Sequence, residues 1–120
     1  MPYQQRDIVK VKRPLPSGGE VTHPFLIISN SRAISHESVP YYTGVMMTHS
    51  TNKDKFSLQV TKEMIDGSYH NDWSQIRLHI IASFSESDIS RDITKYVGKM
   101  KKLDFTAVLN QIKDNILSVD

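Results

Sequence analysis

The chain of 120 residues contains no cysteine. It can therefore form no disulfide, use no thiolate nucleophile and build no cysteine-ligated zinc site, and this composition fits a reducing compartment. No segment approaches the roughly 20 apolar residues that a helix needs to cross a bilayer. The N-terminus, MPYQQRDIVKVKRP, also lacks the apolar centre of a signal peptide. We therefore expect a cytoplasmic protein that does not associate with membranes.

The chain also lacks a large excess of positive charge, and it lacks metal-binding motifs. The 15 Lys and Arg residues exceed the 13 Asp and Glu residues by only two, which is weaker than the charge of a dedicated nucleic-acid-binding domain. The five histidines show no HxH or HExxH spacing, so we expect no metal site and no cofactor. Hydrophobic residues make up 38% of the chain, and a chain of this length can bury one core. The sequence predicts a single domain over residues 1–120.

Short segments of alternating or continuous apolar character predict a sheet. The expected strands cover residues 7–13, 24–29, 41–48, 55–61, about 73–84 and about 92–97. Residues 24–29 (PFLIIS) are apolar throughout, which is typical of a strand buried on both faces. The strands at 41–48 and 55–61 flank the polar turn HSTNKD, so we expect them to pair as an antiparallel hairpin. Residues 14–21, which contain two prolines and a Gly-Gly pair, predict a mobile loop or a long hairpin turn.

The C-terminal segment changes to a helical period. Its apolar positions follow the spacing i, i+3, i+4, i+7, i+11, and they are Phe105, Val108, Leu109, Ile112 and Ile116. Asp104 is placed to cap this helix. Short strands followed by one amphipathic helix predict a mainly β fold, a small and strongly bent antiparallel sheet or barrel with a C-terminal helix.

One predicted strand carries polar chemistry on one face. In SQIRLHII (residues 74–81), Arg77 and His79 share a face because strand side chains alternate. An arginine offers a permanent charge and a planar fork of donors for phosphoryl oxygens, and a histidine exchanges protons near neutral pH. Two side chains placed in this way can converge on one phosphate. The alternative is that Arg77 pairs with a neighbouring acid and that His79 is a surface or interface residue.

Two further histidines lie in segments that suit a functional site. His23 stands between the Gly-rich segment and the buried strand, where a capping or packing role is the alternative. His49 lies between Thr48 and Ser50 in the sequence THST. The two hydroxyls can bind a phosphate, or they can bind only the backbone of their own turn. His36 and His70 lie in turn-like segments and are expected to be plain surface residues.

The order of these segments resembles that of the PemK/MazF family of toxin endoribonucleases. The likeness runs from about Arg6 to Leu117, and it is carried by DIVKV, THPFLIISN, GVMMTHS, SQIRLHII and the closing VGKMKKLDFTAVLNQI. The resemblance implies a small SH3-like, strongly twisted antiparallel barrel with a C-terminal helix, assembled as a homodimer. It also implies metal-free cleavage of single-stranded RNA and inhibition by a cognate antitoxin bound over the active site. Operator DNA, bound together with the antitoxin, is a further candidate partner.

The resemblance assigns roles to several residues. Arg77 matches the catalytic strand arginine of the family, and Thr48 matches the threonine of its phosphate-contacting turn. Candidate RNA-binding residues are Ser50 and His49 in that turn, Asp7, which matches an acid that contacts RNA in some members, and the basic Lys10 and Lys12. Two positions depart from the family pattern: His23 replaces an arginine, and His79 replaces an aspartate.

Metal-free RNA cleavage needs a base for the 2′-OH proton, an acid for the leaving 5′-oxygen and a cation for the phosphorane. Our hypothesis assigns the base to His79, charge stabilisation and proton donation to Arg77, and a second acid–base or phosphate-binding role to His23. The products are then a 2′,3′-cyclic phosphate and a 5′-hydroxyl. Two alternatives stay open. One is a catalytically weak or inactive barrel that binds RNA, DNA or a protein. The other is a gyrase-poisoning toxin, although those proteins end in Trp-Gly-Ile and this chain ends in LSVD.

Overall fold

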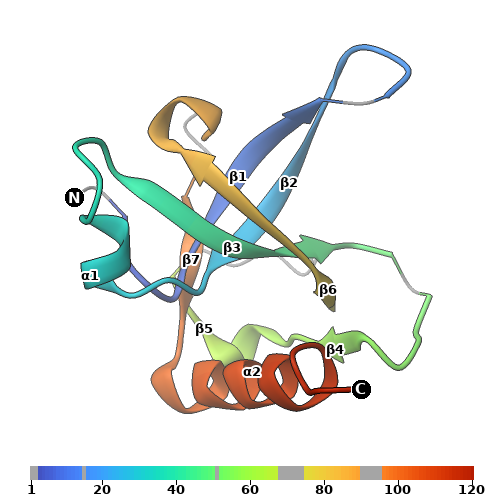
Figure 1. Cartoon of the computed structure of the whole chain (residues 1–120). Coiled ribbons are helices and arrows are strands. Elements are labelled where there is room, and N and C mark those ends of the chain that lie inside the picture. Colours follow the sequence, from blue (N-terminus) through green and yellow to red (C-terminus); the bar gives the residue numbers. More distant parts are fainter. Residues whose placement is uncertain (1–2, 15, 51, 68–74, 90–95) are drawn as a thin grey trace.

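The computed structural model describes residues 3–14, 16–50, 52–67, 75–89 and 96–120. These residues form a strongly bent sheet with a helix lying along the bottom of the view in Figure 1. The strands are β1 (Asp7–Pro14), β2 (Glu20–Ile27), β3 (Tyr41–Thr48), β4 (Ser57–Gln59), β5 (Ile65–Asp66), β6 (Gln75–Ser85) and β7 (Tyr96–Met100). The helices are α1 (Ser31–Ile34) and α2 (Lys102–Asn115), and two 3-10 turns, η1 and η2, cover Lys62–Met64 and Glu86–Asp88. In the described parts of the chain, no helix is long and apolar enough to span a membrane.

The strands form one sheet in the order β4-β6-β3-β2-β1-β7-β5, and every neighbouring pair is antiparallel. The predicted mainly β fold with a C-terminal helix is confirmed. Two predicted strands extend beyond the described residues, since residues 73–74 and 92–95 lie outside them. The Gly-rich segment forms a hairpin turn between β1 and β2, which stay paired as far as Pro14 and Glu20.

The predicted hairpin between residues 41–48 and 55–61 is wrong. β6 lies between β3 and β4 and pairs with both. One edge of β3 is bonded to β2 and the other to β6, so β3 has no edge left for β4. The polar turn does reverse the chain. The strand that follows it, β4, however pairs with β6, which comes later in the sequence.

β6 is irregular where its register with β3 shifts. Its pairing with β3 moves from Val45 opposite Ile81 to Met46 opposite Arg77. Residues 78–80 therefore have no partner on β3, and the Leu78 N–H instead donates to the Phe56 carbonyl at 2.9 Å. An interruption of this kind bends a strand and redirects its side chains. Arg77 lies directly beside this bend.

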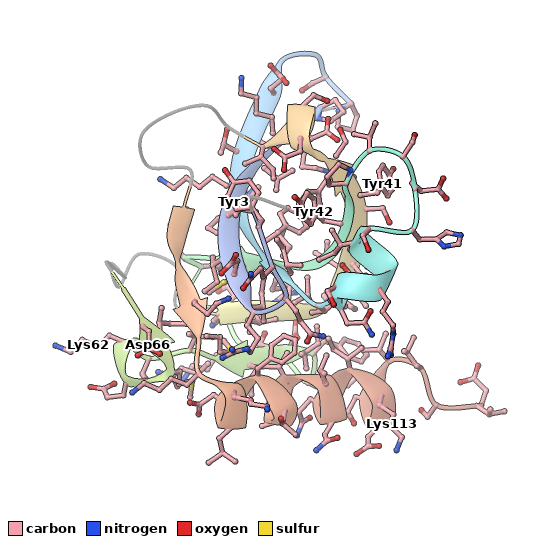
Figure 2. All side chains as sticks on the ribbon, turned by 90° about the vertical axis from the view of Figure 1, so that its left-hand side faces the viewer. Tyr3, Tyr41, Tyr42, Lys62, Asp66 and Lys113 are labelled. Carbon is pink, nitrogen blue, oxygen red and sulfur yellow. The ribbon has the colours of Figure 1, made fainter. Side chains whose placement is uncertain are left out.

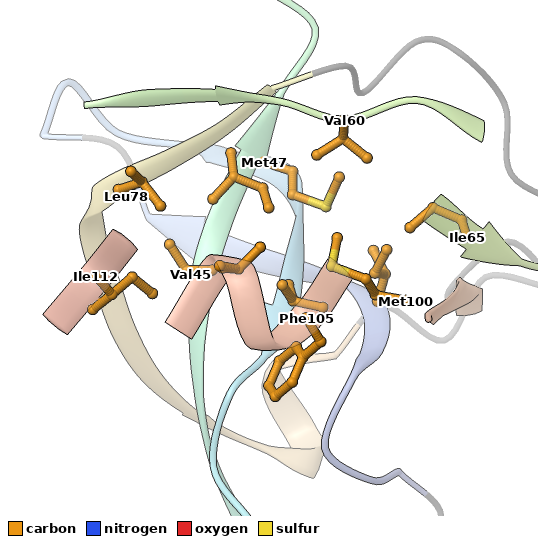
Figure 3. Close-up of a cluster of buried hydrophobic side chains, with 12 residues drawn as sticks. Val45, Met47, Val60, Ile65, Leu78, Met100, Phe105 and Ile112 are labelled. Carbon is orange, nitrogen blue, oxygen red and sulfur yellow. The ribbon is translucent and has the colours of Figure 1, made fainter. Parts of the chain in front are cut away.

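Two clusters of buried side chains fill the fold. The first core cluster is Ile8, Leu26, Val45, Met47, Val60, Ile65, Ile76, Leu78, Met100, Phe105, Val108 and Ile112, and Figure 3 shows it between the strands and α2. The second core cluster is Tyr3, Val9, Val11, Phe25, Ile27, Ile34, Tyr42, Phe84 and Ile89, and the labelled Tyr3 and Tyr42 place it away from α2 in Figure 2. Phe25 and Leu26 belong to different clusters, so β2 is buried on both faces as predicted.

The apolar stripe of α2 packs as predicted, but the helix begins earlier than expected. Phe105, Val108 and Ile112 are buried in the first core cluster, with Leu109 and Ile116 packed against it. The helix starts at Lys102, so Asp104 is not the capping residue. It lies in the first turn, where a carboxylate is favoured by the positive end of the helix dipole.

Candidate active site

Arg77 lies where three strands of the sheet meet. On β6 it is opposite Met46 of β3 on one side and opposite Ser57 of β4 on the other. Its two flanking apolar residues, Ile76 and Leu78, are buried in the first core cluster. The core therefore fixes the backbone on both sides of Arg77, and the alternation of the strand directs Arg77 away from that core.

The Arg77 guanidinium contacts the segment that leads into β4. Its Nη2 lies 2.9 Å from Oδ2 of Asp54, and its Nη1 donates to the Ser57 hydroxyl at 3.0 Å. An ion pair with a neighbouring acid, the alternative role of Arg77, is therefore present. It is accessible, since the side chains of Arg77 and Asp54 are 20% and 47% exposed. The charge of the arginine can therefore be approached from solvent.

A pocket of about 350 Å³ opens beside this ion pair. Its lining residues are Met46, Thr48, Ser50, Asn52, Asp54 and Arg77. The fold thus brings Arg77 together with Thr48 and Ser50, which lie far from it in sequence. The Thr48 hydroxyl accepts the Ser50 N–H at 3.3 Å, and the Ser50 hydroxyl accepts the Asn52 N–H at 3.2 Å. Both hydroxyls thus hold their own turn, and each keeps an O–H that can donate to a ligand.

His79 lies outside the residues that line the pocket. Its side chain is exposed, and its ring centroid lies 5.3 Å from that of Phe56. The Lys55 ammonium lies 5.1 Å from the same Phe56 ring. The bend that begins after Arg77 thus places His79 against an aromatic side chain on the segment before β4, while Arg77 contacts Asp54 and Ser57.

His23 and His49 lie close enough to influence each other. Partial burial lowers the pKa of His23 below its usual value, the charge of His49 lowers it further, and a backbone hydrogen bond with Met47 opposes the shift. β2 therefore places His23 beside the end of β3, next to the turn that holds Thr48 and Ser50. The lowered pKa favours the neutral imidazole, which is the form that accepts a proton.

Comparison with known proteins agrees with the fold and with the order of the motifs. A family model described as the PemK-like, MazF-like toxin of type II toxin-antitoxin systems matches residues 4–116. The chain belongs to this family. No curated protein sequence is significantly similar to it.

Solved structures of this toxin type have similar folds. One is a MazE–MazF complex from Deinococcus radiodurans, with a TM-score of 0.71, 9% identity and 98% coverage of both chains. A mycobacterial endoribonuclease in complex with its cognate antitoxin has a TM-score of 0.68, 12% identity and 98% coverage of both chains. A second mycobacterial endoribonuclease has a TM-score of 0.60 and 13% identity over 92% of this chain and 84% of its own. At these identities the likeness concerns the fold.

The remaining predicted RNA-binding residues of this PemK/MazF-type toxin lie outside the pocket. Asp7 is only 6% exposed. Its carboxylate lies 3.1 Å from the Lys99 ammonium and accepts the Gln4 N–H at 2.7 Å. Lys10 and Lys12 alternate with Val9 and Val11 on β1, so they lie on the opposite face of that strand from the second core cluster. An RNA-binding role for these residues stays a prediction.

The toxin also has pocket residues for which the sequence predicted no role. Asp54, Asn52 and Met46 line the pocket, and Ser57 contacts Arg77. The acid of the HSTNKD turn was visible in the sequence. The predicted pairing of β4 with β3, however, did not bring this turn next to Arg77. In the described ranges, no group of three or more His, Cys, Asp or Glu side chains is arranged to hold a metal ion.

Proposed function

We propose that this toxin is a metal-independent endoribonuclease that cleaves single-stranded mRNA. In this proposal the 2′-hydroxyl attacks the adjacent phosphate and leaves a 2′,3′-cyclic phosphate and a 5′-hydroxyl. The observation that carries the proposal is the pocket in which Arg77 lies together with Thr48 and Ser50. A cation and two hydroxyl donors in one open pocket suit a phosphodiester. Membership of the toxin family supports the same reaction.

Arg77 is proposed to stabilise the negative charge that develops on the phosphorane. A guanidinium can donate two parallel hydrogen bonds to phosphoryl oxygens, and groups fixed in place before the reaction stabilise transition-state charge most effectively. Thr48 and Ser50 are proposed to orient the same phosphate through their O–H groups. These interactions need no metal ion, because the protein supplies the positive charge.

Proton transfer is assigned to the two histidines next to the pocket. His79 is the proposed base, since it follows Arg77 by two residues on β6 and is exposed to solvent. His23 is the proposed second acid–base group, and its lowered pKa suits proton acceptance better than phosphate binding. A positioned acid or base contributes roughly 10²- to 10⁴-fold to a rate.

The first experiment is cleavage of a long single-stranded RNA in EDTA. The wild type should cleave, and Arg77→Ala should lose activity by about 10²-fold or more. Arg32→Ala is the matched control, because Arg32 is an exposed arginine on α1 outside the pocket. End-group analysis should find cyclic phosphates, and a 2′-deoxy nucleotide at the cut site should block the reaction. Equal activity of Arg77→Ala and Arg32→Ala would refute the role of Arg77.

The second experiment separates the histidines. His79→Ala and His23→Ala should each lower kcat by about 10²-fold or more if each transfers a proton. Full activity in His79→Ala removes His79 from the mechanism and leaves His23 as the base. His36→Ala serves as the control, since His36 is an exposed histidine in the segment after α1.

One observation favours a second function, a barrel that binds RNA without cutting it. Arg77 is already paired with Asp54, and neither His23 nor His79 lines the pocket. RNA binding that Arg77→Ala weakens, with no cleavage of any RNA by the wild type, would support this reading. In either case we propose a cognate antitoxin and a second copy of the chain as protein partners. A monomer mass at micromolar concentration would contradict the homodimer.

A further inference from the structure

We propose that Asp54, together with Ser57, positions the guanidinium of Arg77 for RNA cleavage. Asp54 is thus a positioning residue of the pocket that acts through Arg77. Because Arg77 acts in the proposed cleavage reaction, this role of Asp54 rests on the proposed function.

The two terminal nitrogens of Arg77 are held by two residues of one short segment. Asp54 Oδ2 lies 2.9 Å from Nη2, and Ser57 Oγ lies 3.0 Å from Nη1. The Ser57 hydroxyl also lies 3.2 Å from Asp54 Oδ1. An arginine side chain is long and has many rotamers, and a single contact leaves its planar end free to rotate. Two contacts to different nitrogens fix the plane of the guanidinium.

The main chain fixes this pair of anchors independently of Arg77. The Phe56 N–H donates to Asp54 Oδ1 at 2.8 Å, and the Asp54 N–H donates to Ser57 Oγ at 3.2 Å. Each carboxylate oxygen therefore has its own partner, one in the backbone and one in Arg77. The Phe56 N–H, followed by Arg77, holds the pKa of Asp54 below its ordinary value, so the carboxylate stays charged at neutral pH. An ordinary surface ion pair lacks such backbone support and orients little.

The anchors leave the arginine able to act on a substrate. A guanidinium carries five N–H donors, and one bond to Asp54 and one to Ser57 leave others for a phosphate. Arg77 and Thr48 line the same pocket, so a phosphate there can contact both. The carboxylate also partly neutralises Arg77 in the free enzyme, which weakens ground-state attraction for RNA. Asp54 should therefore raise kcat without improving the binding of substrate.

The expected effect on kcat but not on KM distinguishes a positioning role of Asp54 from a purely structural one. Asp54→Asn keeps the size and the acceptor for the Phe56 N–H but loses the charge. We expect kcat to fall by about 10- to 100-fold, the size expected for a misplaced reacting group, with KM unchanged or lower. Asp114→Asn is the matched control, because Asp114 is an exposed acid on α2, and it should change neither constant more than about twofold. Ser57→Ala should lower kcat in the same direction as Asp54→Asn.

The decisive measurement combines Asp54→Asn with Arg77→Ala. If Asp54 acts through Arg77, the double variant should be no slower than Arg77→Ala alone, because residues that act as a unit are not additive. A further fall in kcat, or a rise in KM with kcat unchanged, would overturn the proposal.

A readout that needs no cleavage separates this proposal from the proposed function. The side-chain Nε–H of Arg77 should be well ordered by NMR relaxation in the wild type and in Asp114→Asn, and less ordered in Asp54→Asn and Ser57→Ala. An unchanged order parameter in Asp54→Asn overturns the positioning role. A wild type that cleaves no RNA but shows the expected loss of order refutes the nuclease function alone. Urea unfolding of each variant confirms that the comparison is made between folded proteins.

Discussion

Replacing Phe105 with alanine should destabilise this toxin far more than replacing Leu103, which lies two positions earlier on α2. Phe105 is 4% exposed and packs in the first core cluster, whereas Leu103 is 85% exposed. Truncating a buried phenylalanine costs about 3–5 kcal/mol, and most surface substitutions stay within about 0.5 kcal/mol. Both variants introduce alanine, the strongest helix former, so helix propensity cannot explain a large difference.

The assay is urea unfolding followed by circular dichroism, together with thermal melts. One kcal/mol shifts the Tm of a domain of this size by about 4 °C, so Phe105→Ala should melt about 12–20 °C lower and Leu103→Ala within about 2 °C of the wild type. The slope m should not change. Met47 and Ile76 share the cluster with Phe105, and they adjoin Thr48 and Arg77 in sequence. RNA cleavage by Phe105→Ala should therefore fail at the lower melting temperature. Equal, small effects of the two variants would refute the docking of α2 through this face.

Three further predictions concern stability. Gly98→Ala should lower the free energy of unfolding by about 1–3 kcal/mol through overpacking, because the Cβ added at residue 98 would lie 2.7 Å from Ile65 Cγ2. An unchanged urea midpoint would contradict the close approach of β5 and β7. Burial lowers the pKa of His23 from 6.5, so the unfolded chain takes up a proton that the folded chain does not, and stability should fall as pH drops below about 6.5. Urea midpoints measured across this range should fall less in His23→Gln; an identical pH dependence would rule out His23 as the source. Tyr42→Phe removes a hydrogen bond of 2.7 Å to Glu86 and should cost about 1.5–3 kcal/mol, a loss that thermal melts would reveal and an unchanged Tm would contradict.

Local periodicity was sufficient to predict most elements of the fold. The stripe on α2 follows from the helical repeat, and the apolar run in β2 indicates burial on both faces. These patterns depend on residues a few positions apart, and neither requires knowledge of a distant partner. The start of α2 was misplaced by three residues, since the residue before the helix is Lys101 and not Asp104; an aspartate is equally suited to the first turn of a helix.

The pairing of strands and the surroundings of Arg77 could not be predicted in the same way. A turn such as HSTNKD indicates that the chain reverses, but it does not say that β6 will insert between β3 and β4. The partners of Arg77, Asp54 and Ser57, follow from that insertion. The relation of Thr48 and Ser50 to Arg77 was predicted only because the family resemblance supplied a long-range relation that periodicity lacks. The contact of His79 with Phe56 also follows from that insertion, and no alternation pattern in the sequence reveals it.

The two outermost strands in the sheet order are its shortest, with three residues in β4 and two in β5. A long, straight outer strand offers a row of free backbone donors and acceptors to which another chain can add, and very short outer strands offer little such template. The brevity of β4 and β5 therefore protects the toxin against fibrillar aggregation.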